Sequence, residues 1–243
     1  MPSSALLISE YLLMTMGTRL FVYHDNRIPQ DCAVIVVSNH RSFLDAPILM
    51  QALKRPIRIA CHHYMGEVPV LKELIKLLGC FPLDKPGQRQ HHFLQQANRF
   101  LQSGQWVGLF PEGGKPMVRL TQPGKMADFQ RGFAHLALRS SVTNLAVLPI
   151  AIASVEETVH FPFPLRLLRL FDSSEPLFNQ PGWHPVAVYH RAHVFIGRPY
   201  WIGEKQKRQY RGRGCRKIVT ELTDYCNQEI DGLLRQGIQK YQR

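Results

Sequence analysis

Strand-like and helix-like runs alternate along most of the chain, and this alternation limits the fold more than any other feature of the sequence. Apolar runs typical of strands occur at residues 33–37, 57–61, 80–83, 106–110, 145–152 and 186–196. Runs with helical spacing occur at residues 42–53, 69–78, 88–102, 129–140 and 215–241. Gly79 and Gly104 stand where the C-terminal stops of helices are expected. The pattern predicts an α/β fold, with a largely parallel central sheet flanked by helices.

The N-terminal segment has a different character. Residues 5–22 are rich in apolar side chains but also contain Ser9, Glu10 and Arg19, whereas a membrane-spanning helix needs about 20 mostly apolar residues. Residues 1–9 hold no Lys or Arg, so the basic start of a signal peptide is missing. We therefore expect an amphipathic helix that either lies in a membrane interface or packs against the domain.

Length, charge and cysteine content narrow the class of protein. A chain of 243 residues with 45% hydrophobic residues can bury a substantial core and is expected to form one globular domain. Its net charge of +12 favours anionic partners such as phosphate substrates, acidic carrier proteins, anionic lipids or nucleic acid. The five cysteines form no Cys-x-x-Cys pattern, which favours reduced thiols in a protein that faces the cytosol.

A polar stretch directly after the apolar run 33–37 contains the first candidate chemistry. It reads NHRSFLD at residues 39–45, and a buried strand would deliver His40 to a sheet edge, where α/β enzymes keep their active sites. A neutral imidazole oriented by a carboxylate, here Asp45, is a general base that can take a proton from a hydroxyl. A simpler interpretation also fits, in which Ser42 caps a helix and Asp45 lies in its first turn as a variant capping box.

Further candidate segments follow the later runs. They read GCFPLDK at residues 79–85, FPEGGKP at 110–116, FQRGFAHLA at 129–137 and VLPIA at 147–151. In order and spacing, and together with residues 39–45, they resemble the sequence blocks of the glycerophospholipid acyltransferase family, most of all its PlsC-like 1-acylglycerol-3-phosphate acyltransferases. The resemblance extends over residues 30–155, with a looser match to residue 200.

The resemblance implies a reaction and a set of site residues. A fatty acyl group would pass from acyl carrier protein or coenzyme A to the free hydroxyl of 1-acylglycerol-3-phosphate, giving phosphatidic acid. His40 would be the general base and Asp45 would orient it. The acceptor would be bound by Lys85, Glu112, Gly113, Gly114, Lys115 and Arg131. The two glycines would let backbone N–H groups approach closely, and Arg131 would offer an anion contact near a helix start.

Two basic positions depart from the family pattern. The second block usually ends in Arg where this chain has Lys85, and the third usually reads Glu-Gly-Thr-Arg where this chain ends in Gly114 and Lys115. Arg binds phosphate with a planar fork, whereas Lys is a flexible point charge. Another lysophospholipid, or glycerol 3-phosphate, therefore stays open as the acceptor.

The expected partners follow from the resemblance and the charge. They are a lysophospholipid acceptor, an acyl carrier protein or coenzyme A thioester donor, and an anionic membrane surface. No cofactor is expected beyond the thioester co-substrate. Residues 1–30 are expected to face the membrane and residues 31–243 to form the acyltransferase domain, at the cytoplasmic face of a membrane. Histidines adjacent in sequence, at 62–63 and 91–92, should point apart on a strand or helix, so no metal site is expected.

Two further segments keep other functions open. Residues 160–171 mix aromatic and Leu side chains with two Arg and two Pro, and they would either insert among lipids or pack over the core. Residues 205–217 carry seven basic residues and no acid, which fits an anionic membrane, RNA or a solvated surface. A non-catalytic lipid-binding module and an RNA-binding protein are the alternatives to an enzyme. Nucleic acid is not an expected partner, because no aromatic-interleaved recognition motif is present.

Overall fold

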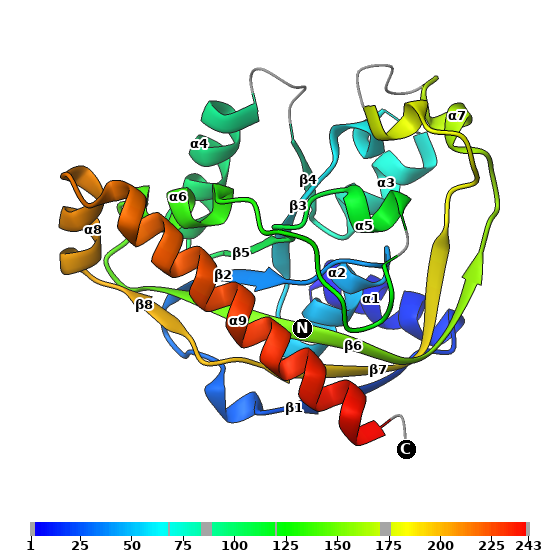
Figure 1. Ribbon diagram of the computed structural model, residues 1–243, viewed down its shortest axis with the longest axis horizontal. Helices are drawn as coiled ribbons and strands as arrows, with labels where there is room; N and C mark the ends of the chain where they lie inside the picture. The colour runs from blue at the N-terminus through cyan, green and yellow to red at the C-terminus, as the bar shows by residue number, and fades with distance from the viewer. Residues whose placement is uncertain (1–2, 68, 84–88, 120, 171–175, 242–243) are drawn as a thin grey trace.

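A mixed β-sheet forms the centre of the computed structural model, which describes residues 3–67, 69–83, 89–119, 121–170 and 176–241. The strands are β1 (Arg19–Tyr23), β2 (Ala33–Ser38), β3 (Ile57–Cys61), β4 (Phe81–Pro82), β5 (Trp106–Leu109), β6 (Leu145–His160), β7 (Val186–Ile196) and β8 (Tyr200–Ile202). Their order is β1-β7-β6-β2-β5-β3-β4, with β8 beside β6 (Figure 1). Neighbours from β6 to β4 run parallel, whereas β7 and β8 are antiparallel to β6. This arrangement confirms the predicted α/β fold with a largely parallel sheet.

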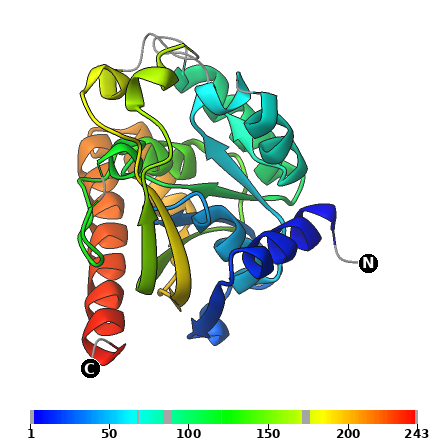
Figure 2. The same ribbon diagram turned by 90° about the vertical axis from the view of Figure 1, so that its right-hand side faces the viewer.

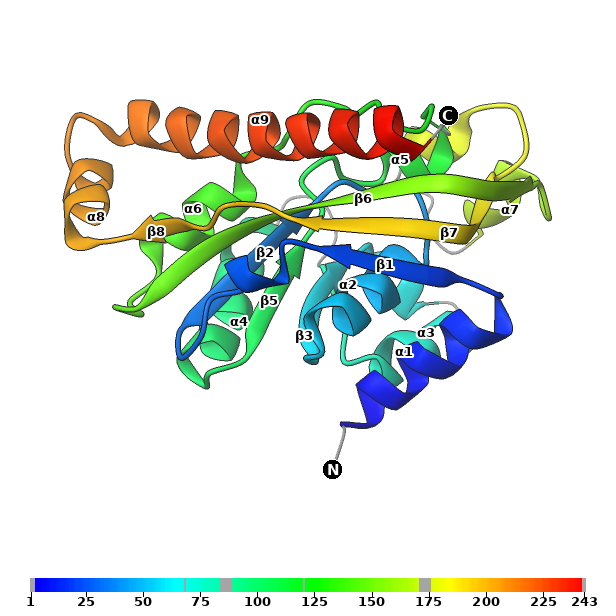
Figure 3. The same ribbon diagram turned by 90° about the horizontal axis from the view of Figure 1, so that it is seen from below.

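Helices cover both faces of this sheet. They are α1 (Ser4–Thr15), α2 (Asp45–Leu53), α3 (Pro69–Leu77), α4 (Arg89–Gln102), α5 (Lys115–Val118), α6 (Gly132–Arg139), α7 (Leu165–Leu168), α8 (Glu204–Arg211) and α9 (Cys215–Tyr241), with 3-10 turns η1 (Asp25–Arg27), η2 (His63–Gly66) and η3 (Pro176–Asn179). Helix α9 crosses one face, and α1 and α2 lie on the other (Figure 3). The side view shows the same two layers on either side of the strands (Figure 2).

Strand β2 shows why the central sheet needs apolar residues on both faces. All of its residues are buried. Val34 and Val36 pack into the cluster that contains α1 and α2, whereas Ile35 and Val37 pack into the cluster that contains α6 and α9. A parallel strand covered on both sides reads as a continuous apolar run rather than an alternating one. Each such side chain stabilises the fold by about 1.5–3 kcal/mol.

The structure corrects two of the predicted elements and adds others. The N-terminal helix is present, but it ends at Thr15, and Gly17 then takes a left-handed φ of 67°. Residues 19–22, expected in the same helix, instead form β1 together with Tyr23 and pair in parallel with β7. Strand β6 continues past residue 152 to His160, where its burial alternates because that half pairs only with β7. Helices α5, α7 and α8 were not predicted as helices.

The register of the central strands determines where the polar stretches meet. Val37 of β2 lies beside Leu109 of β5, and Ser38 lies beside Ile150 of β6. Because these strands are parallel, their carboxyl ends reach the same edge of the sheet. Residues 39–45 and residues 110–116 therefore leave the sheet side by side.

Candidate active site

His40 and Asp45 form a hydrogen-bonded pair at the carboxyl end of β2. His40 Nδ1 lies 2.9 Å from Asp45 Oδ2, and the imidazole is partly buried while the carboxylate is fully buried. With Nδ1–H donating to the carboxylate, the neutral ring keeps Nε2 as its proton acceptor. In this geometry the Asp45 carboxylate orients the His40 ring and favours the tautomer that can act as a base at Nε2.

Asp45 also organises the turn between the strand and α2. Its Oδ2 atom accepts the backbone N–H groups of Arg41 (2.8 Å) and Ser42 (2.9 Å) as well as the imidazole. The bond to the Ser42 N–H is one half of the capping box considered above. The other half is absent, because the Ser42 hydroxyl donates to the carbonyl of Ala187 and accepts from the Leu44 N–H. The same oxygen, Asp45 Oδ2, therefore orients the His40 ring and stabilises the turn before α2.

Asn39 fixes the loop to the neighbouring strand. Its side-chain amide donates to the Ile152 carbonyl (2.9 Å), and its side-chain oxygen accepts from the Ile152 N–H (2.8 Å). These two hydrogen bonds extend the β2–β6 pairing by one step beyond Ser38, with the Asn39 side chain in place of a backbone amide. The position of His40 is therefore set by the sheet itself.

Glu112 connects the third block to His40. Its Oε1 atom accepts the His40 backbone N–H at 2.9 Å, and its Oε2 atom accepts the Ala127 N–H at 2.5 Å. Burial raises the pKa of this carboxyl, and the two backbone hydrogen bonds act in the opposite direction. Both oxygens of Glu112 are thus engaged with backbone of the protein, which gives this residue a positioning role in addition to the predicted contact with the acceptor.

The residues around Glu112 shape the same corner of the site. The Phe110 ring stacks on the His40 imidazole, with centroids 4.1 Å apart and an interplanar angle of 11°. Gly113 has a φ of 69°, and a Cβ atom there would lie 2.8 Å from the side-chain nitrogen of Gln130. The left-handed backbone conformation favours glycine at this position, whereas the contact would be relieved by a shift of the flexible Gln130 side chain.

A cavity of about 490 Å³ opens beside the third block. It is lined by Glu112, Lys115, Met126, Ala127, Asp128, Phe129 and Gln130. Lys115 is exposed at the start of α5, and Gly114 is the residue before this helix. Arg131 is exposed at the start of α6, next to the lining residue Gln130. Of the predicted acceptor-binding residues, Glu112 and Lys115 therefore line the cavity, whereas Gly113, Gly114 and Arg131 are sequence neighbours of lining residues. Lys85 lies outside the described residues.

Arg41 and Glu157 form an ion pair that the sequence did not indicate. The guanidinium makes two bonds to the carboxylate, at 2.8 and 2.9 Å, and a third to the Thr121 carbonyl at 2.9 Å. Burial is the largest single effect and opposes the charge of Glu157, but the hydrogen bonds from Arg41 and Ser154 together with the charge of Arg41 outweigh it and lower the pKa of the carboxyl. The pair ties the His40 loop to the outer half of β6.

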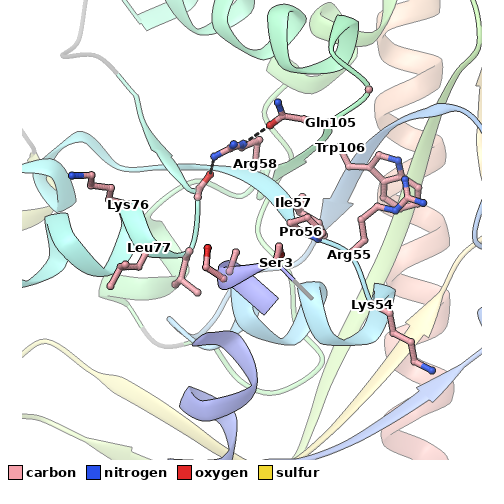
Figure 4. A pocket seen from close by; sticks show the side chains of 15 residues that line it. Ser3, Lys54, Arg55, Pro56, Ile57, Arg58, Lys76, Leu77, Gln105 and Trp106 are labelled. Atoms are coloured by element: carbon pink, nitrogen blue, oxygen red, sulfur yellow. Dashed lines mark hydrogen bonds between the residues drawn. The ribbon is translucent and has the colours of Figure 1, made fainter. Parts of the chain in front are cut away.

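A second cavity, of about 620 Å³, lies at the amino ends of β3 and β5, opposite the His40 edge. Arg58 bonds there to the Gln105 side chain and the Gly79 carbonyl, and Arg55 stacks over Trp106 at 4.4 Å. The lysine side chains, at 54 and 76, point to opposite sides (Figure 4). These cations do not converge on a common point, so this cavity is a poor candidate for anion binding.

The described ranges contain no group of three His, Cys, Asp or Glu residues that could hold a metal ion. One supporting expectation was wrong: the rings of His62 and His63 lie 4.7 Å apart, because the chain there is neither a strand nor an α-helix but leads into η2. Among the described helices, none is both long and apolar enough to cross a membrane.

Comparisons with known proteins find several similar sequences. A protein from Mycoplasma pneumoniae named probable 1-acyl-sn-glycerol-3-phosphate acyltransferase is 25% identical over 151 residues, covering 60% of this chain and 53% of that protein. The N-acylphosphatidylethanolamine synthase of Arabidopsis thaliana is 26% identical over 190 residues, covering 68% of this chain and 63% of that protein. The chain therefore spans less than two thirds of the length of either relative.

The fold is also that of a solved structure. The crystal structure of PlsC, the 1-acyl-sn-glycerophosphate acyltransferase from Thermotoga maritima, matches with a TM-score of 0.60 at 18% identity, over 96% of this chain and 77% of that one. The family model described as Acyltransferase matches residues 19–153, which include the His40–Asp45 pair and the third block. Because this match covers more than half of the chain, the protein belongs to the acyltransferase family.

Proposed function

We propose that the protein transfers a fatty acyl group from a thioester to the free hydroxyl of 1-acylglycerol-3-phosphate, giving phosphatidic acid. The observation that carries this proposal is the 2.9 Å contact between His40 Nδ1 and Asp45 Oδ2. The pair stands at the carboxyl edge of the sheet, where Glu112 connects it to the cavity that contains Lys115. The family supplies the reaction type, acyl transfer, and this geometry supplies a base for an alcohol acceptor.

The proposed mechanism needs no covalent acyl-enzyme. Nε2 of His40 takes the proton of the acceptor hydroxyl while its oxygen attacks the thioester carbonyl. Asp45 stabilises the imidazolium that results. The tetrahedral intermediate then collapses, the C–S bond breaks, and the imidazolium returns the proton to the departing thiolate. A positioned base of this kind typically contributes about 10²–10⁴ to the rate.

The acceptor is held on the cavity side of the pair. Lys115 meets the phosphate, and Arg131 adds a second cation at the start of α6. Gly113 and Gly114 keep side chains away from the glycerol, and Glu112 holds the loop against His40. Lys85 stays a predicted third cation. Both donors considered, acyl carrier protein and coenzyme A thioesters, are anionic and suit the net charge of +12.

A second acceptor is favoured by a specific observation. One relative is named N-acylphosphatidylethanolamine synthase, and Lys115 stands where the family pattern has Arg. Phosphatidylethanolamine, another lysophospholipid and glycerol 3-phosphate are therefore the alternative acceptors. In each case the protein would act at the cytoplasmic face of a membrane, as a peripheral or monotopic protein. The division into a membrane-facing segment 1–30 and an acyltransferase domain 31–243 stays a prediction.

The test is acyl transfer by the purified protein with each acceptor, using acyl carrier protein and coenzyme A donors separately. We expect turnover with 1-acylglycerol-3-phosphate and a loss of about 10²–10⁴-fold in His40→Ala. Asp45→Asn should also lose activity, whereas His160→Ala, an exposed histidine on β6, is the matched control and should keep it. A fully active His40→Ala protein would contradict the mechanism. Turnover with a different acceptor alone would contradict the proposed substrate.

A further inference from the structure

A small lobe stands apart from the main core near the active site. We define the α7 lobe as the described residues 161–170 and 176–184, which include α7 and η3. Its interior is a separate apolar cluster of Val118, Leu165, Leu168 and Phe178, with Phe163 packed against it. Backbone bonds close the lobe, from Leu165 N–H to the Gly182 carbonyl and from His184 N–H to the Phe163 carbonyl.

The lobe is joined to the candidate site through α5. Val118 is the last residue of α5, and this helix begins at Lys115, which lines the cavity beside Glu112. Figure 1 shows α7 above α5, at the end of the long β6–β7 hairpin. A membrane that contacts the lobe would therefore lie close to the cavity beside Glu112, where a lipid acceptor would enter.

The lobe exposes several large apolar side chains. Phe161 is 58% exposed, Leu170 is 79% exposed and Trp183 is 55% exposed, and Leu167 also points outward. On α7, Leu165 and Leu168 face the lobe interior, so the exposed Leu side chains are not needed for its packing. Exposed apolar side chains gathered in this way are typical of an interaction surface. Trp in particular favours the boundary between water and lipid.

The charges on the lobe indicate the kind of surface. Arg166 and Arg169 are exposed on it, and its described residues contain no Asp or Glu. Asp172 and Glu175 occur in the sequence between its two halves, outside the described residues. Long Arg side chains among Leu and Trp can bind lipid phosphates while the apolar groups enter the acyl region.

Helix α1 is the other exposed apolar surface to consider. Its outward residues Leu7, Tyr11 and Met14 are exposed, but the helix has no basic residue, and Glu10 is exposed on it. An anionic membrane would therefore attract the α7 lobe more strongly than α1.

We propose that the α7 lobe is the surface that inserts into an anionic lipid bilayer and holds the active site at the lipid boundary. The proposal rests on the proposed function only in that the acceptor is a membrane lipid. Leu167, Leu170 and Trp183 enter the interfacial region, and Arg166 and Arg169 bind headgroup phosphates. The lysophospholipid then reaches the cavity without leaving the membrane surface.

Tryptophan fluorescence tests the insertion directly, because the chain has three Trp residues in different surroundings. Trp106 is buried, and Trp201 is 49% exposed on β8, at the end of the molecule opposite α7 in Figure 1. Trp201→Phe leaves Trp183 as the exposed reporter, and Trp183→Phe leaves Trp201. The full chain is mixed with vesicles of phosphatidylcholine and phosphatidylglycerol that carry brominated acyl chains. We expect a blue shift and quenching in Trp201→Phe and neither in Trp183→Phe. The reverse result, or the same change in both, would overturn the proposal.

Vesicle flotation supplies a second measurement that needs no turnover, so an inactive protein is still tested. The double variant Leu167→Ser/Leu170→Ser should bind these vesicles at least tenfold more weakly than the unmodified chain. The matched variant Tyr11→Ser/Met14→Ser on α1 should bind as the unmodified chain does. Equal losses in both variants would overturn the assignment to the lobe. Equal binding to pure phosphatidylcholine vesicles would overturn the preference for an anionic surface.

Discussion

Glu112 illustrates how a single residue joins segments that are distant in sequence. Its carboxylate holds the His40 backbone N–H on one side and the Ala127 N–H on the other, while it is almost fully buried. Its position in the third block predicted a contact with the acceptor. The structure adds that one of the carboxylate oxygens fixes the loop that carries His40, while the other binds the Ala127 N–H.

We predict that Glu112→Gln lowers the free energy of unfolding by about 1–3 kcal/mol, because the amide has one acceptor oxygen and its NH₂ group would face a buried N–H donor. The rate of acyl transfer should fall as well, since the His40 backbone loses its anchor. Urea unfolding and a kcat measurement check both effects. Glu204→Gln, at an exposed position on α8, is the control and should change neither. An unfolding curve for Glu112→Gln that matches the unmodified protein would contradict the anchoring role.

The Arg41–Glu157 pair predicts a pH-dependent contribution to stability. The pKa of Glu157 is lowered in the fold from its ordinary value of 4.5, because burial, which raises it, is outweighed by the Arg41 and Ser154 hydrogen bonds together with the charge of Arg41. A lowered folded pKa means that the pair stabilises the protein fully above about pH 4.5. This contribution is lost as the pH falls through the folded value.

At pH 7, Glu157→Gln should therefore reduce the free energy of unfolding by about 3 kcal/mol, because it leaves the buried Arg41 without its counter-charge. The difference from the unmodified protein should shrink below pH 4.5. Urea titrations at pH 7, 5 and 3.5 measure it. The adjacent Glu156→Gln is the matched control, since its pair with Arg19 is exposed at 3.4 Å and should contribute less than about 0.5 kcal/mol. A constant difference at all three pH values would contradict the assignment.

The sequence predicted the local part of the site better than the distant part. His40 and Asp45 are five residues apart, so their pairing depends only on a short turn. The partners of Asn39 and Arg41, by contrast, lie 113 and 116 residues away on β6. Those contacts depend on the register between β2 and β6, and spacing along one sequence does not contain that register. For this reason the sequence alone did not identify Glu157 as the partner of Arg41.

At the scale of elements, most strands were predicted, including the edge strand β4, whereas the edge strand β1 and the short strand β8 were not. β3 and β7 have the predicted bounds, and β2 is longer by one residue. β1 was not predicted as a strand, because a short, half-exposed apolar run does not distinguish a strand from a helix. α5 and α7 have four residues each, which is too short for a helical period to show in the sequence.

Helix α9 offers a matched pair of glycines that tests its packing on the sheet. A Cβ atom at Gly237 would lie 2.6 Å from the Phe195 ring and 3.1 Å from Ala153, whereas Gly232 has no neighbour within 4 Å. Gly237→Ala should therefore lower the free energy of unfolding by about 1–3 kcal/mol through overpacking. Gly232→Ala should raise it by about 0.5–1 kcal/mol, because Ala favours the helix. Chemical denaturation of both variants measures the two changes, and effects of the same sign would contradict the close approach of α9 to β6 and β7.

At the scale of the whole molecule, the positive charge is spread well beyond the candidate site. The basic run at residues 205–217 lies on α8 and the start of α9, at the opposite end of the molecule from α7 (Figure 1). Within it, Lys207 is buried and donates to the Val142 carbonyl, while its Arg residues are exposed. Part of the net charge of +12 therefore lies far from the candidate site, where it adds to the long-range field of the molecule.

The positive charge predicts that salt slows the association of the protein with an anionic donor. The rate of the chemical step should not depend on salt. Raising the salt from 0.02 to 0.5 M shortens the screening length from roughly 20 Å to roughly 4 Å. The kcat/KM for an anionic acyl donor should therefore fall by about tenfold, with kcat nearly unchanged. A neutral acyl thioester of N-acetylcysteamine, which carries no charge to steer, is the control and should show a flat kcat/KM. An equal fall with the neutral donor would mean that salt acts on the fold or on the reaction, and a flat response with both would mean that the net charge does not steer the donor.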